Sequence, residues 1–166
     1  MQNYFMTKPS KKLSEQTKDY TFQNNQRLSA LFGKKNDLIL IHNMGKSCPY
    51  CTMWADGFNG LLPHLQNRAS FVVSSPDDPQ TQKEFANARG WKFQMVSTMG
   101  TTFAKDMGFE KDGMPQPGVS VFYKEGSKII RTGKDSFGPG DVYCPTFPLF
   151  DMLKDGTGDW QAKFQY

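Results

Sequence analysis

Two cysteines three positions apart, Cys48 and Cys51, constrain this chain more than any other feature. An apolar run at residues 38–41 precedes them and predicts a buried strand. Apolar side chains recur after them at roughly helical spacing, at Met53, Trp54, Phe58, Leu61, Leu62 and Leu65. The pattern therefore places a dithiol at the junction between a strand and a helix.

A dithiol at that junction has a chemical rationale. The first thiol, Cys48, would meet the unpaired N–H groups and the positive dipole end of the helix, which favour its thiolate. Cys51 would lie one turn further on the same face, within reach of the first sulfur. Pro49 suits the first helical turn because its missing N–H would have had no partner there. The motif predicts thiol–disulfide exchange, with Cys48 as nucleophile and Cys51 as resolving thiol.

Length and composition fit one globular domain in a reducing compartment. A chain of 166 residues can bury roughly two-thirds of its unfolded surface without a disulfide. The three cysteines do not show the spacing of a disulfide-rich secreted domain. They indicate redox or metal chemistry instead. The N-terminus lacks a signal-peptide core, and no apolar run reaches membrane-spanning length. We expect a cytoplasmic protein with no membrane partner.

Positive charge is concentrated near the N-terminus. Residues 1–35 hold seven of the 20 Lys and Arg residues and only two of the 16 Asp and Glu residues. Residues 1–19 are polar and lysine-rich without a sustained period, so we predict an N-terminal arm ahead of a domain spanning 20–166. A nucleic-acid surface needs a basic stripe with aromatic residues or a known motif. The sequence shows neither, so no nucleic-acid partner is expected.

The predicted elements follow one another in an α/β order. Short strands are expected at 20–22, 37–43 and 70–74, an extended stretch at 91–97, and a hairpin at 119–123 and 128–130. Helices are expected at 27–32, after the dithiol, from the 75–79 turn to Gly90, at 101–107 and at 149–154. Gly57 and Gly60 should bend or interrupt the dithiol helix. The prediction is a central mixed sheet flanked by helices on both faces.

Cys48-Pro49-Tyr50-Cys51 resembles the active site of the glutaredoxins and thioredoxins, and Pro117 before a Val-Ser-Val-Phe strand resembles their cis-proline. More closely, residues 20–122 resemble a bacterial thioredoxin-like family of unassigned function, often described as predicted dithiol–disulfide oxidoreductases. The similar elements are Leu31-Phe32-Gly33, His42-Asn43-Met44, Trp54-Ala55-Asp56-Gly57, Val73-Ser74, Gly90-Trp91, Val96-Ser97, Asp106-Met107-Gly108 and Val119-Ser120-Val121-Phe122. The resemblance implies a thioredoxin-like fold with an N-terminal extension, and redox use.

Several residues around the dithiol carry individual expectations. Tyr50 should be exposed, where it could touch substrate, and Trp54 should be core, close enough to cover the Cys51 sulfur. Asp56 stands where thioredoxins often have a proline, and a helix-bending or hydrogen-bonding role is favoured for it. The Gln116–Pro117 bond is expected to be cis and to face the dithiol, presenting backbone to an incoming chain.

Two further residues have both a structural and a functional interpretation. For Cys144, a packed and inert thiol is favoured over a third redox partner. For His42, a structurally satisfied histidine is favoured over one that tunes the dithiol electrostatically.

Three function classes remain open at this point. The first is a dithiol–disulfide oxidoreductase that takes protein or small-molecule disulfides, uses a cellular thiol reductant and needs no cofactor. The second is a peroxidase of the peroxiredoxin type, although Gly45 stands three residues before Cys48, where peroxiredoxins carry threonine. The third is a zinc module, which lacks a second cysteine pair, so no metal is expected. A non-catalytic thioredoxin-fold scaffold is a further alternative.

Overall fold

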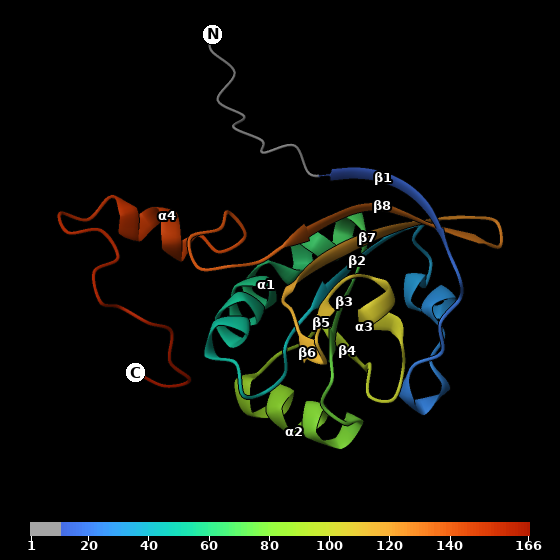
Figure 1. Ribbon diagram of the computed structural model, residues 1–166, viewed down its shortest axis with the longest axis horizontal. Helices are drawn as coiled ribbons and strands as arrows, with labels where there is room; N and C mark the ends of the chain where they lie inside the picture. The colour runs from blue at the N-terminus through green and yellow to red at the C-terminus, as the bar shows by residue number, and fades with distance from the viewer. Residues whose placement is uncertain (1–10) are drawn as a thin grey trace, which may run out of the picture.

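The computed structural model describes residues 11–166, and strand β2 (Asp37–His42) lies at the centre of its main sheet. The strand order is β1-β8-β7-β2-β3-β4 (Figure 1). β2 runs parallel to β3 (Ser70–Ser75), which runs parallel to β4 (Gln94–Ser97). On its other side β2 is antiparallel to β7 (Gly118–Glu125), followed by β8 (Lys128–Ser136) and β1 (Lys11–Thr17). The sheet is mixed, as predicted.

Alternating side chains of β2 build two separate cores. Leu38 and Leu40 face a cluster with the 3-10 helix η2 (Leu28–Phe32) and with α3 (Phe103–Asp106). The short 3-10 helix η1 (Gln23–Asn25) precedes η2 and buries no side chain. Ile39 and Ile41 face a second cluster under α1 (Pro49–Arg68) and α2 (Pro79–Arg89). The period of two expected for a strand thus puts helices on both faces, which confirms the predicted α/β thioredoxin-like class.

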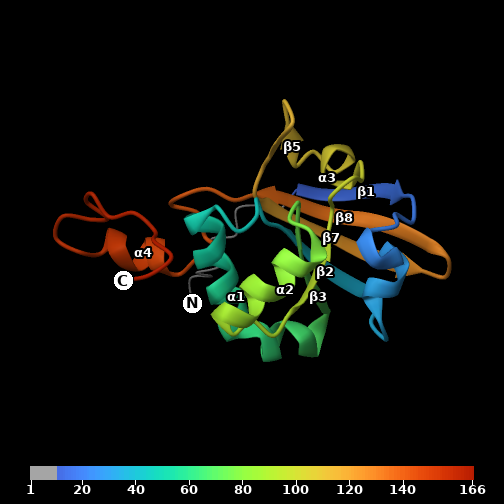
Figure 2. The ribbon, with the colours of Figure 1, turned by 90° about the horizontal axis from the view of Figure 1, so that it is seen from below.

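α1 and α2 lie side by side on their face of the sheet (Figure 2). Asp56 of α1 accepts two hydrogen bonds from Arg89 and one from Trp91, at 3.0, 2.6 and 2.7 Å. This confirms the hydrogen-bonding role favoured for Asp56 and places it away from the dithiol. The predicted interruption of α1 is wrong, because the helix continues through Gly57 and Gly60 to Arg68.

The N-terminal part of the chain differs from the prediction. Residues 11–17, assigned to the arm, form β1, which pairs with β8 from Lys11 opposite Lys134 to Thr17 opposite Ile129. The strand predicted at 20–22 is reduced to one bridge between Thr21 and Arg27. The remainder of the arm, residues 1–10, lies outside the described residues. Lysine-rich composition concealed an edge strand, since charged residues are tolerated there.

The elements after β4 follow the predicted order with one addition. A small hairpin of β5 (Glu110–Lys111) and β6 (Met114–Pro115) precedes β7. The β7–β8 hairpin and α3 lie where they were expected. α4 (Thr146–Asp151) lies beyond α1, away from the strands, in both ribbon views (Figures 1 and 2). No helix within residues 11–166 combines the length and apolarity needed to cross a membrane.

Candidate active site

The loop that carries the dithiol is fixed by Asn43, directly after β2. The Asn43 side-chain oxygen accepts the Gly45 N–H at 2.8 Å, and its amide group donates to the Cys51 carbonyl at 3.4 Å. The Cys48 N–H donates to the Gly45 carbonyl at 3.1 Å and closes a turn. α1 then begins at Pro49 with Cys48 as its N-cap. Sequence reasoning missed this role of Asn43, although it belongs to the quoted His42-Asn43-Met44 element.

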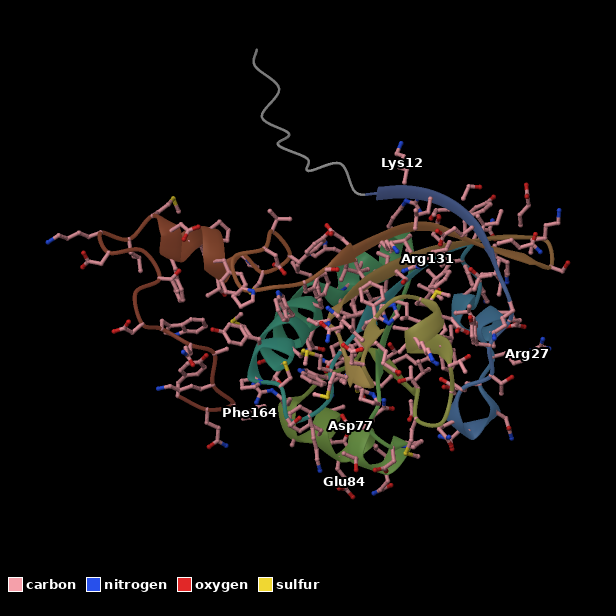
Figure 3. The ribbon with its side chains drawn as sticks, viewed as in Figure 1. Lys12, Arg27, Asp77, Glu84, Arg131 and Phe164 are labelled. Carbon is pink, nitrogen blue, oxygen red and sulfur yellow. The ribbon has the colours of Figure 1, made fainter. Side chains whose placement is uncertain are left out.

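Asp77 supports the same loop from the turn between β3 and α2 (Figure 3). Its carboxylate accepts the Lys46 N–H at 2.8 Å and the Ser75 hydroxyl at 3.3 Å. Gly45 has a φ of +106°, and a Cβ there would lie 3.1 Å from the Asp77 carboxylate oxygens. Glycine is thus required by both the backbone and the neighbouring carboxylate. The sequence marked residues 75–79 as a helix start but gave no signal that Asp77 contacts the dithiol loop.

Cys48 lies half-buried at the exposed N-terminal end of α1, where the sequence predicted it. The Cys51 N–H donates to its sulfur at 3.1 Å. A hydrogen bond with the Cys51 thiol, together with the N–H groups of Cys51 and Tyr50, lowers the pKa of Cys48 to about 7 against the opposing effect of burial. A large fraction of Cys48 is therefore thiolate at neutral pH, which is the form that attacks sulfur or oxygen.

Cys51 has the opposite character. It is only 2% exposed, in the cluster formed under α1. Its hydrogen bond to Cys48 and its burial raise its pKa far above the ordinary thiol value. Cys48 is thus an accessible thiolate, and Cys51 is a buried thiol that donates a hydrogen bond to it.

Tyr50 and Trp54 are covered by the C-terminal segment 137–147. The ring of Tyr50 stacks on Phe147 with centroids 6.5 Å apart, and Trp54 packs on Phe137 at 5.4 Å. The Trp54 indole N–H donates to Asp141 at 3.3 Å. Trp54 is buried, as predicted, but the expectation of an exposed Tyr50 is wrong: the segment makes it half-buried. No pattern in the sequence indicates that this segment returns to the dithiol helix.

Cys144 belongs to that segment. Its side chain is buried in the same apolar cluster as Cys51, and its thiol donates to the Thr146 hydroxyl at 3.4 Å. The packed thiol expected from the sequence is therefore present, in the same cluster as Cys51 and Trp54 of the dithiol helix.

The predicted cis bond at Gln116–Pro117 is wrong, because every peptide bond within residues 11–166 is trans. These two residues join β6 directly to β7, and an extended connection of this kind needs no reversal of the chain. The Gln116 N–H donates to the Phe109 carbonyl at 2.8 Å, and the Pro117 carbonyl accepts from Phe137 at 3.0 Å. Gly118 pairs with His42, so Pro117 lies at the same sheet edge as the dithiol loop.

His42 is buried on the opposite face of the sheet from α1. Its Nε2 lies 2.8 Å from the Ser120 hydroxyl, and its ring stacks on Phe109 with centroids 4.0 Å apart. Burial, aided by the charge of Arg131, lowers the pKa of His42 well below its usual range. The structural interpretation favoured from the sequence agrees with these contacts. Within residues 11–166, no three His, Cys, Asp or Glu side chains are grouped to hold a metal ion.

The mixed sheet, the helices on both faces and the Cys-Pro-Tyr-Cys turn at the start of α1 define a thioredoxin-fold dithiol protein. The family described as bacterial protein of unknown function, DUF899, matches residues 9–165, and the chain belongs to it. This confirms the resemblance to a thioredoxin-like family of unassigned function. No curated protein matches the chain.

Solved structures with a similar fold include peroxiredoxins. Peroxidoxin BcpB from Mycobacterium tuberculosis has a TM-score of 0.65 at 24% identity, covering 75% of this chain and 85% of its own. The C47S mutant of PrxQ from Xylella fastidiosa has a TM-score of 0.61 at 17% identity, covering 77% and 88%. A peroxiredoxin-like protein from Aquifex aeolicus has a TM-score of 0.57 at 17% identity, covering 77% of each chain. At these identities the similarity shows the fold.

Proposed function

We propose that this protein is a thiol–disulfide oxidoreductase in which Cys48 attacks a substrate disulfide and Cys51 resolves the product. The observation that supports this most directly is the asymmetry of the two thiols. Cys48 accepts the Cys51 N–H at 3.1 Å and has a pKa of about 7, whereas burial and the hydrogen bond to Cys48 raise the pKa of Cys51. One sulfur is ready to attack while the other is held as a thiol.

The exchange runs in two steps. The Cys48 thiolate attacks one sulfur of the substrate, the substrate S–S bond breaks, and the other sulfur leaves as a thiolate that takes a proton. Cys51 then loses its proton and attacks the Cys48 sulfur, which forms the Cys48–Cys51 disulfide and releases the second substrate thiol. Two electrons pass from the dithiol to the substrate. A cellular thiol reductant restores the dithiol by the reverse exchange.

Residues around the dithiol are proposed to guide the substrate. Pro49 and Tyr50 lie beside Cys48 in the first turn of α1, and Trp54 anchors that turn to Asp141. Gln116 and Pro117 approach from the neighbouring strand connection at the same sheet edge. The N–H of Gln116 and the carbonyl of Pro117 are already paired within the protein. The remaining backbone group between them, the Gln116 carbonyl, is the acceptor that we assign to an incoming peptide chain.

Serine variants of the two cysteines test the assignment with 2-hydroxyethyl disulfide as the model substrate. At pH 7 we expect Cys51→Ser to accumulate a mixed disulfide on Cys48, detected by mass spectrometry, and Cys48→Ser to remain unmodified. Cys144→Ala is the matched control and should keep disulfide reductase activity within about threefold of the parent. Faster modification of Cys51 in Cys48→Ser than of Cys48 in Cys51→Ser would reverse the roles.

A peroxidase is the second candidate, favoured by the similarity in fold to peroxiredoxins. In this reaction the Cys48 thiolate attacks a peroxide oxygen, the O–O bond breaks, and water or an alcohol leaves as Cys48 becomes a sulfenic acid. Cys51 condenses with that acid, forming the same disulfide and releasing water. Turnover with hydrogen peroxide as the sole oxidant, compared with turnover with 2-hydroxyethyl disulfide, separates the two candidates. Gly45 in place of threonine favours the disulfide.

A further inference from the structure

A cavity lies at the carboxyl ends of the parallel strands, on the face of the sheet opposite to α1. It has a volume of about 270 Å³ and is lined by residues that follow or end β2, β3 and β4, together with α3 and the β5–β6 hairpin. Ligands in open α/β sheets bind outside the carboxyl ends of the strands, where the chain direction changes from one side to the other. Here the change falls at β2, between β3 and β7.

Three residues that line this carboxyl-edge pocket have hydroxyl groups whose protons are already used within the protein. Three hydroxyl groups in its lining donate their protons to backbone carbonyls: Ser74 to Ile41 at 3.0 Å, Thr98 to Ser75 at 3.2 Å, and Thr101 to Thr98 at 2.8 Å. A hydroxyl has one proton and two lone pairs, so these groups can only accept further hydrogen bonds. The lining therefore suits a ligand that carries N–H or O–H groups.

His42 adds an unused polar atom to the pocket. The side chain is only 4% exposed, and Nε2 is paired with Ser120. Within residues 11–166 no hydrogen bond is made to Nδ1, and this atom is not sealed from solvent. Stacking on Phe109 fixes the ring, so Nδ1 is held in place without a protein partner. Because Nδ1 is open to solvent and has no protein partner, a ligand in the pocket can take the place of water and form a hydrogen bond with it.

The charges around the pocket argue against an ionic ligand. Among the described residues, Glu110 is the one charged side chain in the lining, so an anion would find no cation there. The guanidinium carbon of Arg131 lies 5.8 Å from the ring centroid of Phe109, and the side chain is almost fully buried. A buried positive charge at that position disfavours a cation beside His42.

We infer that the carboxyl-edge pocket is a binding site for a small uncharged carboxamide. The two N–H groups of a primary carboxamide can donate to hydroxyl oxygens in the lining, and its carbonyl can accept from His42 Nδ1 where that atom carries the proton; in the other tautomer one N–H donates to Nδ1 instead. The volume is slightly below the ~300–1,000 Å³ of pockets that hold drug-sized ligands, so the ligand is small. Asn43 lines the pocket and also bonds the Cys51 carbonyl, which puts the ligand beside the dithiol loop.

Four isosteric probes test the chemistry: propionamide, butan-2-one, propionate and propylammonium. Backbone amide shifts of Thr98, Thr101 and Asn43 are followed by two-dimensional NMR during titration of the full chain. We expect saturable shifts with propionamide, and binding about fivefold weaker or more with butan-2-one, which lacks the N–H donors. Equal binding of these two, stronger binding of either ion, or no saturable shift with any probe would overturn the inference.

Two substitutions on α3 locate the site. Ala104 lines the pocket, and Ala104→Leu should fill it and abolish the propionamide shifts. Lys105→Leu is the matched control on the exposed side of the same helix and should leave the affinity unchanged. Cys48→Ser should also bind propionamide as the parent does, because the pocket uses neither thiol. Binding that survives Ala104→Leu would place the probe elsewhere.

Discussion

The two faces of the sheet use the end of the same strand for different chemistry. On the α1 face, β2 leads into a dithiol surrounded by apolar and aromatic side chains, where a hydrogen bond from Cys51 lowers the pKa of Cys48 to about 7. On the α3 face, the same strand ends in His42, which is neutral and fixed by Ser120 and Phe109. Successive side chains of β2 point to opposite faces of the sheet. The cysteine that titrates near neutrality, Cys48, is thereby kept apart from the neutral His42 on the other face.

Truncation of Trp54, on the α1 face, should cause the largest loss of stability. Trp54→Ala removes a buried indole that packs on Phe137 and Phe147 and donates to Asp141. The expected loss is about 3–5 kcal/mol of unfolding free energy, measured by urea denaturation. Because the segment 137–147 loses its anchor, the Cys144 thiol should also react faster with a thiol reagent.

Leu61→Ala is the control for Trp54, since Leu61 lies on the same helix and is 49% exposed. It should change stability by less than about 0.5 kcal/mol. If Trp54→Ala leaves Cys144 as slow to react as in the parent, the C-terminal segment is held on the α1 face by other contacts.

A methyl group at Gly118 should disturb the α3 face instead. A Cβ there would lie 2.2 Å from a Phe109 ring carbon and 2.4 Å from the Asp135 carbonyl oxygen, so the ring that stacks on His42 has to move. Gly118→Ala is expected to cost about 1–3 kcal/mol, the usual cost of overpacking. Chemical denaturation measures the loss, and the NMR shifts of the His42 ring report the lost stacking. Unchanged His42 shifts would show that the strand, not Phe109, absorbs the clash.

The pH dependence of thiol reactivity sharpens the contrast between the faces. With a pKa of about 7 for Cys48, alkylation by iodoacetamide should rise about tenfold per pH unit below pH 7, as the thiolate fraction grows, and level off above it. The profile should have one step, because the pKa of His42 lies well below its usual range and the ring stays neutral. A second step between pH 6 and 7 would show that another group, such as His42, titrates there and changes the reactivity of Cys48.

Cys51→Ala is the informative variant for this profile. The hydrogen bond from Cys51 is the largest cause of the lowered pKa of Cys48. Its removal should move the midpoint of the alkylation profile upward, toward the free thiol value of about 8.5. A midpoint that stays near 7 would assign the lowered pKa to the helix N-terminus alone.

Elements whose formation depends on neighbouring residues could be predicted from local patterns in the sequence. The apolar run at 38–41, the dithiol after it and the 119–130 hairpin each contain their own signal, so the central strands, α1 and the position of Cys48 and Cys51 at its start could be predicted. Long-range packing decided the rest. Tyr50 is covered by Phe147, almost a hundred residues later, and Asn43 and Asp77 brace the loop through contacts that no spacing encodes.

The glycines of α1 show the same limit and give the smallest predicted effect. Gly57 favours an interruption on propensity alone, yet α1 continues through it because Trp54, Phe58 and Leu62 bury one face of the helix. A Cβ at Gly57 would have no atom within 4 Å. Gly57→Ala should therefore raise the unfolding free energy by about 0.5–1 kcal/mol, the difference in helix propensity, measured by urea denaturation. Alkylation of Cys48 should be unchanged. A destabilised Gly57→Ala variant would mean that α1 needs glycine here for a bend that its neighbours impose.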